Sequence, residues 1–352
     1  MASAGPPPAP GPARREVVDV HSHILLEGVM GLCGEAGPEM GVRPGGTHYF
    51  RAGQYVLEGV RFVGSPFADV EVRLEHMARL GIDHQVVSPN PITYFYRQPA
   101  RLAVDFNRRH NDLVAEVAAA NDRLSGFACL PLQDPAAAAA ELERAVTELG
   151  LVGSYIGSDV GGVPLSDPRF EEVWAEHERL GVPVVVHPAP RNVERPGDAD
   201  YARWELDVVY GFLVDEGLAV AHLVLGGVLD RHPRLAVHVP HGGGFAPYQV
   251  GRLETALEKR PWGRGLLRRS FEEQWSQLSF DTAVHRADAL AFLVATQGAG
   301  RVLHGCNFAG WDQEERSVAM VEALAIGEEE KAAILAGNAR RLFRLREPGA
   351  RS

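Results

Sequence analysis

The sequence predicts a closed (β/α)₈ barrel, the TIM-barrel fold, from three observations. Short β-rich runs alternate with helical patterns along most of the 352 residues. There are eight such runs, the number of strands that closes a parallel sheet into a barrel. No Gly-x-Gly-x-x-Gly follows the first run, which disfavours an open dinucleotide-binding sheet.

The predicted strands are runs rich in β-branched and aromatic residues, each bounded by polar or turn-forming residues. In chain order they cover residues 16–21, 83–88, 125–131, 153–158, 183–187, 235–240, 277–282 and 301–305. Helical patterns lie between them, for example at residues 67–81, 101–121, 134–150 and 170–181. Asp134 followed by Pro135 is typical of a helix start, and Gly150 and Gly181 are typical of helix ends.

Two connections are longer than a barrel needs. Residues 24–66 form a Gly-rich insertion after the first strand, and residues 189–234 carry extra helices after the fifth. Long loops after barrel strands commonly build the active site. The Pro/Ala-rich residues 1–15 are predicted to be a disordered tail rather than a signal peptide, and residues 347–352 a C-terminal tail. The barrel is therefore expected to span residues 16–346.

Composition narrows the class of partner. The formal net charge of −11 argues against a general nucleic-acid or anionic-membrane surface, and no run approaches the length of a membrane span. Cys33, Cys129 and Cys306 are far apart, odd in number and without Cys-x-x-Cys spacing, which fits a reducing compartment. We therefore expect a cytoplasmic protein that binds neither nucleic acid nor membrane.

The first predicted strand ends in His21-Ser22-His23. Because side chains at i and i+2 point to the same face of a strand, His21 and His23 should point together. Two neutral imidazoles on one face can hold a transition metal. Taken alone, such a pair is more often the polar end of a strand.

Polar residues also end the later strands. His187 ends the fifth strand, His241 the sixth and Asp281 the seventh, and the eighth runs into HGCNFAGWD at residues 304–312. The carboxyl ends of barrel strands meet at one rim, so these side chains should gather there. The sequence therefore predicts a site for one divalent metal at this rim.

These motifs together resemble the amidohydrolase superfamily. DVHSH, VVHPAP, HGGGFAPYQVGR and the eighth-strand turn resemble the branch that contains 2-amino-3-carboxymuconate-6-semialdehyde decarboxylase and related aromatic-acid decarboxylases. The stretches VRLEHMARLGIDHQVVSP (72–89) and LPLQDPAAAAAELERAV (130–146) also fit this branch. The resemblance covers nearly the whole chain after the tail.

The resemblance implies roles for individual residues. His21, His23 and His187 match metal ligands, with zinc expected before manganese. His241 matches the histidine that activates a metal-bound water and later moves a proton. Arg61 stands where the family places an arginine that binds the substrate carboxylate.

Arg252 matches an arginine that reaches into the neighbouring subunit's site in the dimeric decarboxylase. The resemblance therefore also implies a homodimer.

The chain departs from the family at its eighth strand. The family has Gly-[Ser/Thr]-Asp there, and its aspartate is a metal ligand; this chain has Gly305-Cys306-Asn307. Asn307 is predicted to contact the metal weakly or to orient substrate, and it is counted with the metal ligands and with the catalytic residues. Alternation places His304 and Cys306 on the opposite face, whereas Asp312 could reach the site from its loop.

The loss of this carboxylate disfavours hydrolysis and favours decarboxylation driven by His241. We therefore predict a metal-dependent non-oxidative decarboxylase for a small aromatic or muconate-type carboxylic acid. The alternatives are a metal-dependent hydrolase or hydratase on a similar ring-cleavage product, and a catalytically silent ligand-binding barrel.

Overall fold

The computed structural model describes residues 14–190, 201 and 203–346. The predicted tails lie outside these residues except at 14–15, and the predicted helical material of 189–234 lies partly outside them.

The barrel strands form two parallel sheets. The three-stranded sheet contains, in spatial order, β1 (Val18–Ile24), β5 (His84–Pro89) and β6 (Leu124–Gly126). The five-stranded sheet contains β13 (Val302–Leu303), β12 (Leu278–Asp281), β11 (Val237–Val239), β10 (Val184–Val186) and β7 (Ser154–Ile156). Each of the eight predicted runs overlaps one of these strands; β1 and β5 end later than predicted, and β6 begins one residue earlier.

Backbone contacts join the two sheets on both sides. An isolated parallel bridge connects Ala128, just after β6, to Ser154 in β7. On the other side Ser22 in β1 is bridged to Phe308, beyond β13, and the His23 N–H donates to the Phe308 carbonyl at 3.0 Å. The sheet is closed, so the predicted (β/α)₈ barrel is confirmed.

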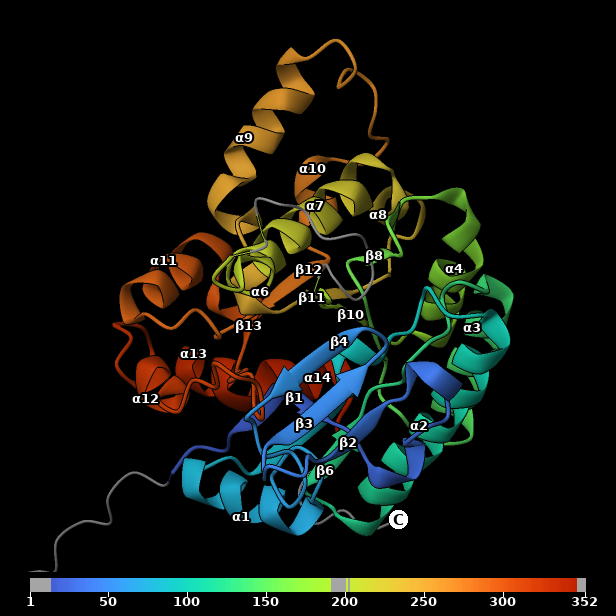
Figure 1. Cartoon of the computed structure of the whole chain (residues 1–352). Helices are drawn as coiled ribbons and strands as arrows, with labels where there is room; N and C mark the ends of the chain where they lie inside the picture. Colours follow the sequence, from blue (N-terminus) through green and yellow to red (C-terminus); the bar gives the residue numbers. More distant parts are fainter. Residues whose placement is uncertain (1–13, 191–200, 202, 347–352) are drawn as a thin grey trace, which may run out of the picture.

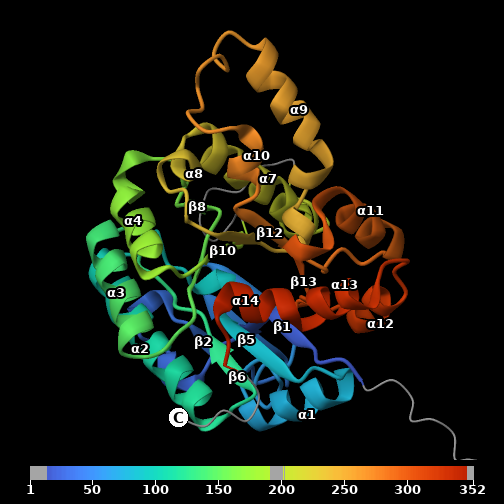
Figure 2. The ribbon, with the colours of Figure 1, turned by 180° about the vertical axis from the view of Figure 1, so that it is seen from behind.

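Helices follow the strands and surround the barrel (Figures 1 and 2). They are α1 (Val70–Leu80), α2 (Ala100–Ala120), α3 (Pro135–Thr147), α4 (Glu171–Leu180), α6 (Leu206–Val209), α7 (Gly211–Leu225), α8 (Val228–Arg231), α9 (Ala246–Lys259), α10 (Phe271–Trp275), α11 (Ala287–Gln297), α12 (Ser317–Glu322), α13 (Glu328–Ala332) and α14 (Asn338–Phe343). The Asp134 carboxylate accepts the Ala137 N–H at 3.1 Å and caps α3, as its position predicts. Gly181 ends α4 in the left-handed conformation, whereas α3 ends before Gly150.

The insertion after β1 contains a small antiparallel sheet of its own. Its strands are β2 (Glu39–Val42), β3 (His48–Ala52) and β4 (Tyr55–Glu58), and they lie across the front of the molecule in Figure 1. Phe50, Phe62 and Phe67 pack together beneath it, with ring centroids 5.0–5.6 Å apart. This sheet supplies one wall of the cavity described below.

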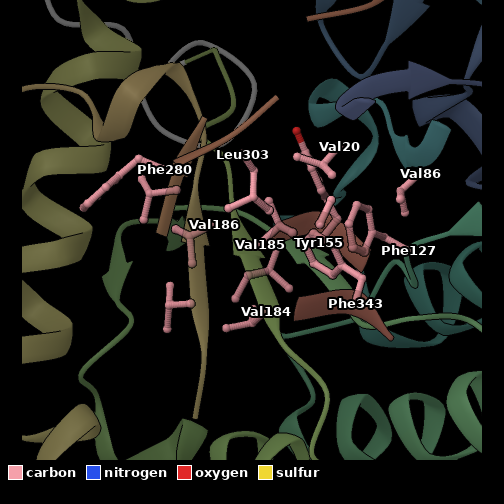
Figure 3. Packing of buried hydrophobic residues seen from close by; sticks show 14 of the residues in the cluster. Val20, Val86, Phe127, Tyr155, Val184, Val185, Val186, Phe280, Leu303 and Phe343 are labelled. Atoms are coloured by element: carbon pink, nitrogen blue, oxygen red, sulfur yellow. The ribbon is translucent and has the colours of Figure 1, made fainter. Parts of the chain in front are cut away.

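The barrel interior is filled by side chains (Figure 3). Val184, Val185 and Val186 are fully buried, as expected for a parallel strand that is covered on both faces. The Phe343 ring, from α14, contacts the Phe127 ring edge-on with centroids 5.0 Å apart. The interior is therefore a packed core, and the chemistry is confined to the rim.

The segment Leu206–Leu225, α6 and α7 together, is long and apolar enough to cross a membrane by length and composition alone. This corrects the expectation that no run approaches that length. Its Asp215 and Glu216 are buried, and Glu216 bonds to His241 at the barrel rim. The segment therefore packs as part of the barrel wall.

Candidate metal centre and active site

The structure brings all four predicted rim histidines together. The ring centroid of His21 lies 5.4 Å from that of His23, 5.3 Å from that of His187 and 4.8 Å from that of His241. All four side chains are buried. Each comes from a strand end, so the alternation within β1 and the meeting of strands at the rim place them as predicted.

Three of these histidines form a tight group of donor atoms. One ring nitrogen each of His21, His187 and His241 lies within 4.8 Å of the other two. Burial, and then the charge of nearby His241, lower the pKa values of His21 and His187 well below the usual range. Both imidazoles are therefore neutral, which is the form that binds a metal.

The hydrogen bonds of His21 and His187 show which of their ring nitrogens are free to bind a metal. His21 Nδ1 donates to Asp281 Oδ2 at 2.7 Å, and His187 Nδ1 donates to the Pro188 carbonyl at 2.6 Å. The opposite nitrogens, His21 Nε2 and His187 Nε2, are buried and have no hydrogen-bond partner among the described residues. Metal-ligating histidines are commonly held in this way by a carboxylate or a carbonyl. The residues therefore fit a divalent metal.

His23 lies at the edge of this group. Its Nδ1 is 3.3 Å from the Pro89 carbonyl oxygen and 3.2 Å from Ser88 Oγ, and burial lowers its pKa to about 4. Its side chain lines the cavity. The close group of donor atoms therefore differs from the predicted ligand set in one member. It contains His241, whereas the prediction has His23.

His241 is paired with a carboxylate from α7. It begins the short turn η6 (His241–Gly243), and its Nδ1 donates to Glu216 Oε1 at 2.7 Å. Burial opposes a positive charge on His241, but attraction to Glu216 outweighs burial and raises its pKa to about 9. Burial raises the pKa of Glu216 to about 7. The pair can hold a proton beside the metal-binding imidazoles.

Asp281 anchors the rim from the end of β12. It is fully buried and accepts hydrogen bonds from His21 Nδ1, from the Gly242 N–H at 3.0 Å and from the Ala283 N–H at 3.0 Å. A methyl group at Gly305 would come within 2.8 Å of Asp281 Oδ2. Glycine is therefore required where β13 passes this carboxylate.

A cavity of about 840 Å³ opens over the histidines. Its polar lining includes His23, Asn90, His187, His241, His285, Asn307 and Asp312. Its apolar lining includes Tyr55, Leu57, Val60, Phe62, Phe67, Ile92, Val208, Val209, Phe212, Leu213, Val284 and Trp311. A mostly apolar cavity of this size with a few convergent polar groups is typical of a small-molecule site.

The sequence profile of the family described as Amidohydrolase matches residues 18–345. The chain belongs to the amidohydrolase family. Within this family, the 2-amino-3-carboxymuconate-6-semialdehyde decarboxylase of Dictyostelium discoideum is 31% identical over 295 residues, which cover 83% of this chain and 81% of that protein.

Two solved structures extend this comparison. A 2,6-dihydroxybenzoate decarboxylase complexed with 2,6-dihydroxybenzoate is 26% identical, with a TM-score of 0.73 over 94% of this chain and 99% of that one. A dihydroxybenzoic acid decarboxylase from Polaromonas sp. JS666, with bound manganese and the inhibitor 2-nitroresorcinol, is 24% identical and shares the fold, with a TM-score of 0.77 over 96% and 100% of the chains. The predicted decarboxylase-containing branch of the amidohydrolases is confirmed.

In this amidohydrolase the eighth-strand asparagine reaches the cavity. Asn307 has a positive φ of 52° and lines the cavity with its loop neighbour Asp312, to which its Nδ2 donates a hydrogen bond. Cys306 instead points away, with Sγ 3.3 Å from Asp19 Oδ2, and His304 Nε2 bonds to Ser317 Oγ. The expected alternation of these residues is confirmed.

The structure brings neither predicted arginine to the cavity. Arg61 is exposed and donates to the Val63 carbonyl at 3.1 Å, while its neighbours Val60 and Phe62 line the cavity. Arg252 is exposed on α9, which projects from the body of the molecule in both views (Figures 1 and 2). Within the described part of the chain, no lysine or arginine lines the cavity.

Sequence reasoning missed two carboxylates of this amidohydrolase site. The rule of polar strand ends does not identify Glu216, although Asp215-Glu216 is an acidic pair inside an otherwise apolar helix, a pattern that signals a buried functional group. The sequence marks Asp281 as the end of a strand but predicts no role for it. Its partner His21 is 260 positions away in the sequence, so only the fold reveals the contact.

Proposed function

We propose that this protein is a metal-dependent non-oxidative decarboxylase, a carbon–carbon lyase that acts on a small aromatic or muconate-type carboxylic acid. The main support for this proposal is the group of buried imidazole nitrogens, which opens onto a largely apolar cavity. The relative and the structures described above are decarboxylases, and one of them holds an aromatic acid. This agreement supports the proposal.

The metal would be held by His21, His23 and His187, with Asn307 as a further weak contact. Imidazole donors suit zinc, which we propose first; manganese, present in a structure of the same fold, is the second choice. A dication bound there supplies a positive charge that holds substrate oxygen atoms and withdraws electrons from the reacting carbon.

His241 would carry the proton of the reaction. Because Glu216 holds Nδ1, the other nitrogen, Nε2, is left to face the reacting carbon. The bond between that carbon and the carboxylate breaks, CO₂ leaves, and the electron pair remains on the carbon. The protonated His241 then donates its proton to that carbon. The apolar walls exclude water and so favour release of the uncharged CO₂.

The substrate carboxylate needs a cation that the described cavity lining lacks. We propose that Arg252 of a second copy supplies it, in a homodimer built on the projecting helix α9. The exposed rings of Tyr248 and Phe292, whose centroids lie 5.5 Å apart, support such an interface, because neighbouring exposed aromatic side chains mark association surfaces. Arg61 is the second candidate, since it lies beside the cavity-lining Val60 and Phe62.

We also propose a cytoplasmic location. Cys33, Cys129 and Cys306 are all free and buried, which suits a reducing compartment.

The test is a turnover assay with the purified protein, loaded with Zn²⁺ or Mn²⁺. It uses a panel of hydroxybenzoates and 2-amino-3-carboxymuconate-6-semialdehyde, and released CO₂ is measured. We expect CO₂ from at least one acid and none after metal removal. A product that gains water without releasing CO₂ would favour the hydrolase or hydratase, and ligand binding without any turnover would favour the silent barrel.

A further inference from the structure

Two imidazoles and one amide near the cavity are each hydrogen-bonded to a carboxylate. His21 bonds to Asp281 and His241 bonds to Glu216, each at 2.7 Å. The third, Asn307, bonds to Asp312. A dication in a buried site bound by neutral donors needs negative charge close behind them. Asp281 supplies that charge behind the His21 imidazole, and Glu216 adds a carboxylate behind the neighbouring His241.

Asn307 is held in one orientation. A carboxylate only accepts hydrogen bonds, so Asp312 Oδ1 must face the amide nitrogen, Asn307 Nδ2. Asn307 Oδ1, the only atom of this amide that can bind a cation, is buried and has no hydrogen-bond partner among the described residues. A methyl group at Gly310 would come within 2.5 Å of this oxygen, so only glycine at position 310 leaves enough space for the Asn307 amide.

Asp312 is itself held in place by a hydrogen bond, and it shares the cavity with the histidine group. His285 Nε2 lies 3.1 Å from Asp312 Oδ2, while His285 Nδ1 lies 3.7 Å from Glu314, which pairs with Arg316. The side chain of Asp312 is 20% exposed and lines the cavity. The Asp312 carboxylate therefore lies on the wall of the same cavity as His187 and His241.

We propose that Asp312 is a positioning residue for the metal: it aims Asn307 Oδ1 at the histidine group and supplies, through that amide, negative charge that the direct donors lack. A carboxylate hydrogen-bonded behind the amide thus replaces a carboxylate at position 307. The inference rests on the metal site of the proposed function and not on the reaction.

The test measures Zn²⁺ affinity by chelator competition in the full-length protein, without substrate. Asp312→Asn keeps an acceptor for Asn307 Nδ2 but removes the charge, and it should weaken Zn²⁺ binding 10- to 100-fold, the usual effect of losing such a supporting residue. Glu315→Gln is the matched control, because it removes an exposed charge from the same loop, and Glu315 bonds to none of His285, Asn307 and Asp312. It should stay within about twofold of the parent.

A charge swap separates this role from a merely structural one. The double variant Asn307→Asp with Asp312→Asn returns the charge directly to the metal and should recover most of the affinity lost in Asp312→Asn. Thermal unfolding without metal checks that each variant folds. Zn²⁺ binding by Asp312→Asn within twofold of the parent would overturn the inference. So would an equal loss in Glu315→Gln, or a double variant no tighter than Asp312→Asn.

The outcomes also separate this inference from the proposed function. A parent protein that binds no Zn²⁺ overturns the metal site and this inference together. A parent that binds Zn²⁺ and loses affinity in Asp312→Asn, yet releases CO₂ from no acid, overturns only the proposed reaction.

Discussion

Glu216 Oε1 lies 2.7 Å from His241 Nδ1, and both side chains are buried between α7 and the end of β11. The contact joins a helix that follows the fifth strand to the turn that follows the sixth. It fixes the face that His241 presents to the cavity, and it favours the protonated imidazole. If His241 is the proton donor of the reaction, its working pH depends on Glu216.

The first prediction concerns the pH dependence that Glu216 sets. His241 is protonated below a pKa of about 9, so a reaction that needs its proton should lose rate as the pH rises through that value. Glu216→Gln removes the attracting charge and lowers this pKa. The alkaline limb of the kcat profile should therefore move down by roughly 1–3 pH units. The exposed Glu258→Gln should leave the limb in place; an unmoved limb in Glu216→Gln would remove Glu216 from this role.

The second prediction concerns His187 as a metal ligand. Its Nε2 is buried without a partner among the described residues, and its Nδ1 is held by the Pro188 carbonyl. His187→Ala removes a donor that nothing nearby replaces, so elemental analysis should show most of the bound metal lost. His222→Ala, on the outer side of α7, is the control and should keep its metal. Full metal content in His187→Ala would contradict the site.

The third prediction separates the two roles open to His241. The sequence predicts an acid–base group, whereas the structure places a His241 nitrogen as near to His21 and His187 as a ligand would be. We expect His241→Ala to keep its metal and to lose about 10²–10⁴-fold in kcat, the scale of one general acid–base group. Loss of metal together with activity would instead make His241 a ligand.

The barrel and its rim of histidines could be predicted because both depend on local pattern. Fully buried valines such as Val184–Val186 mark strands, and i, i+2 spacing places His21 and His23 on one face. The histidines that could bind the metal directly could be predicted from the single rule that barrel strands end at one rim.

The supporting carboxylates could not be predicted in this way. Glu216 lies on a helix, where strand alternation says nothing, and Asp281 acquires its role only when β12 is brought beside β1. The expectation for Arg61 came from resemblance alone. The conformation of the insertion decides where its side chain points, and here it turns to the Val63 carbonyl.

The fourth prediction concerns Asp281 and stability. Asp281→Ala leaves the buried Gly242 and Ala283 N–H groups and His21 Nδ1 without their acceptor. Unpaired buried donors are costly, so the free energy of unfolding should fall by about 2–4 kcal/mol in urea titrations. Asp288→Ala removes an exposed carboxylate from the same region and should change it by less than about 0.5 kcal/mol. Equal stability of the two variants would show that Asp281 is not an anchor.

The last prediction tests the proposed homodimer. If Arg252 binds the substrate of the partner subunit, each active site draws on two chains. Arg252→Ala and His241→Ala should each be inactive as pure proteins. A mixed dimer of the two contains one site in which His241 and the partner's Arg252 are both intact. Mixing after reversible dissociation should therefore restore activity, up to about half of the wild-type rate per mixed dimer.

The complementation experiment needs two controls. Mixed dimers are confirmed by native mass spectrometry, so that a failure to mix is not mistaken for a failure to complement. The exposed Arg264→Ala lies beyond the end of α9 and should keep full activity by itself. Confirmed mixed dimers without activity would place the substrate-binding cation on the same chain, where Arg61 is the candidate among the described residues. A monomer by light scattering at assay concentration would remove the partner arginine altogether. Restored activity would instead show that the partner subunit supplies the cation for the substrate carboxylate. This would explain why the described cavity lining contains no lysine or arginine.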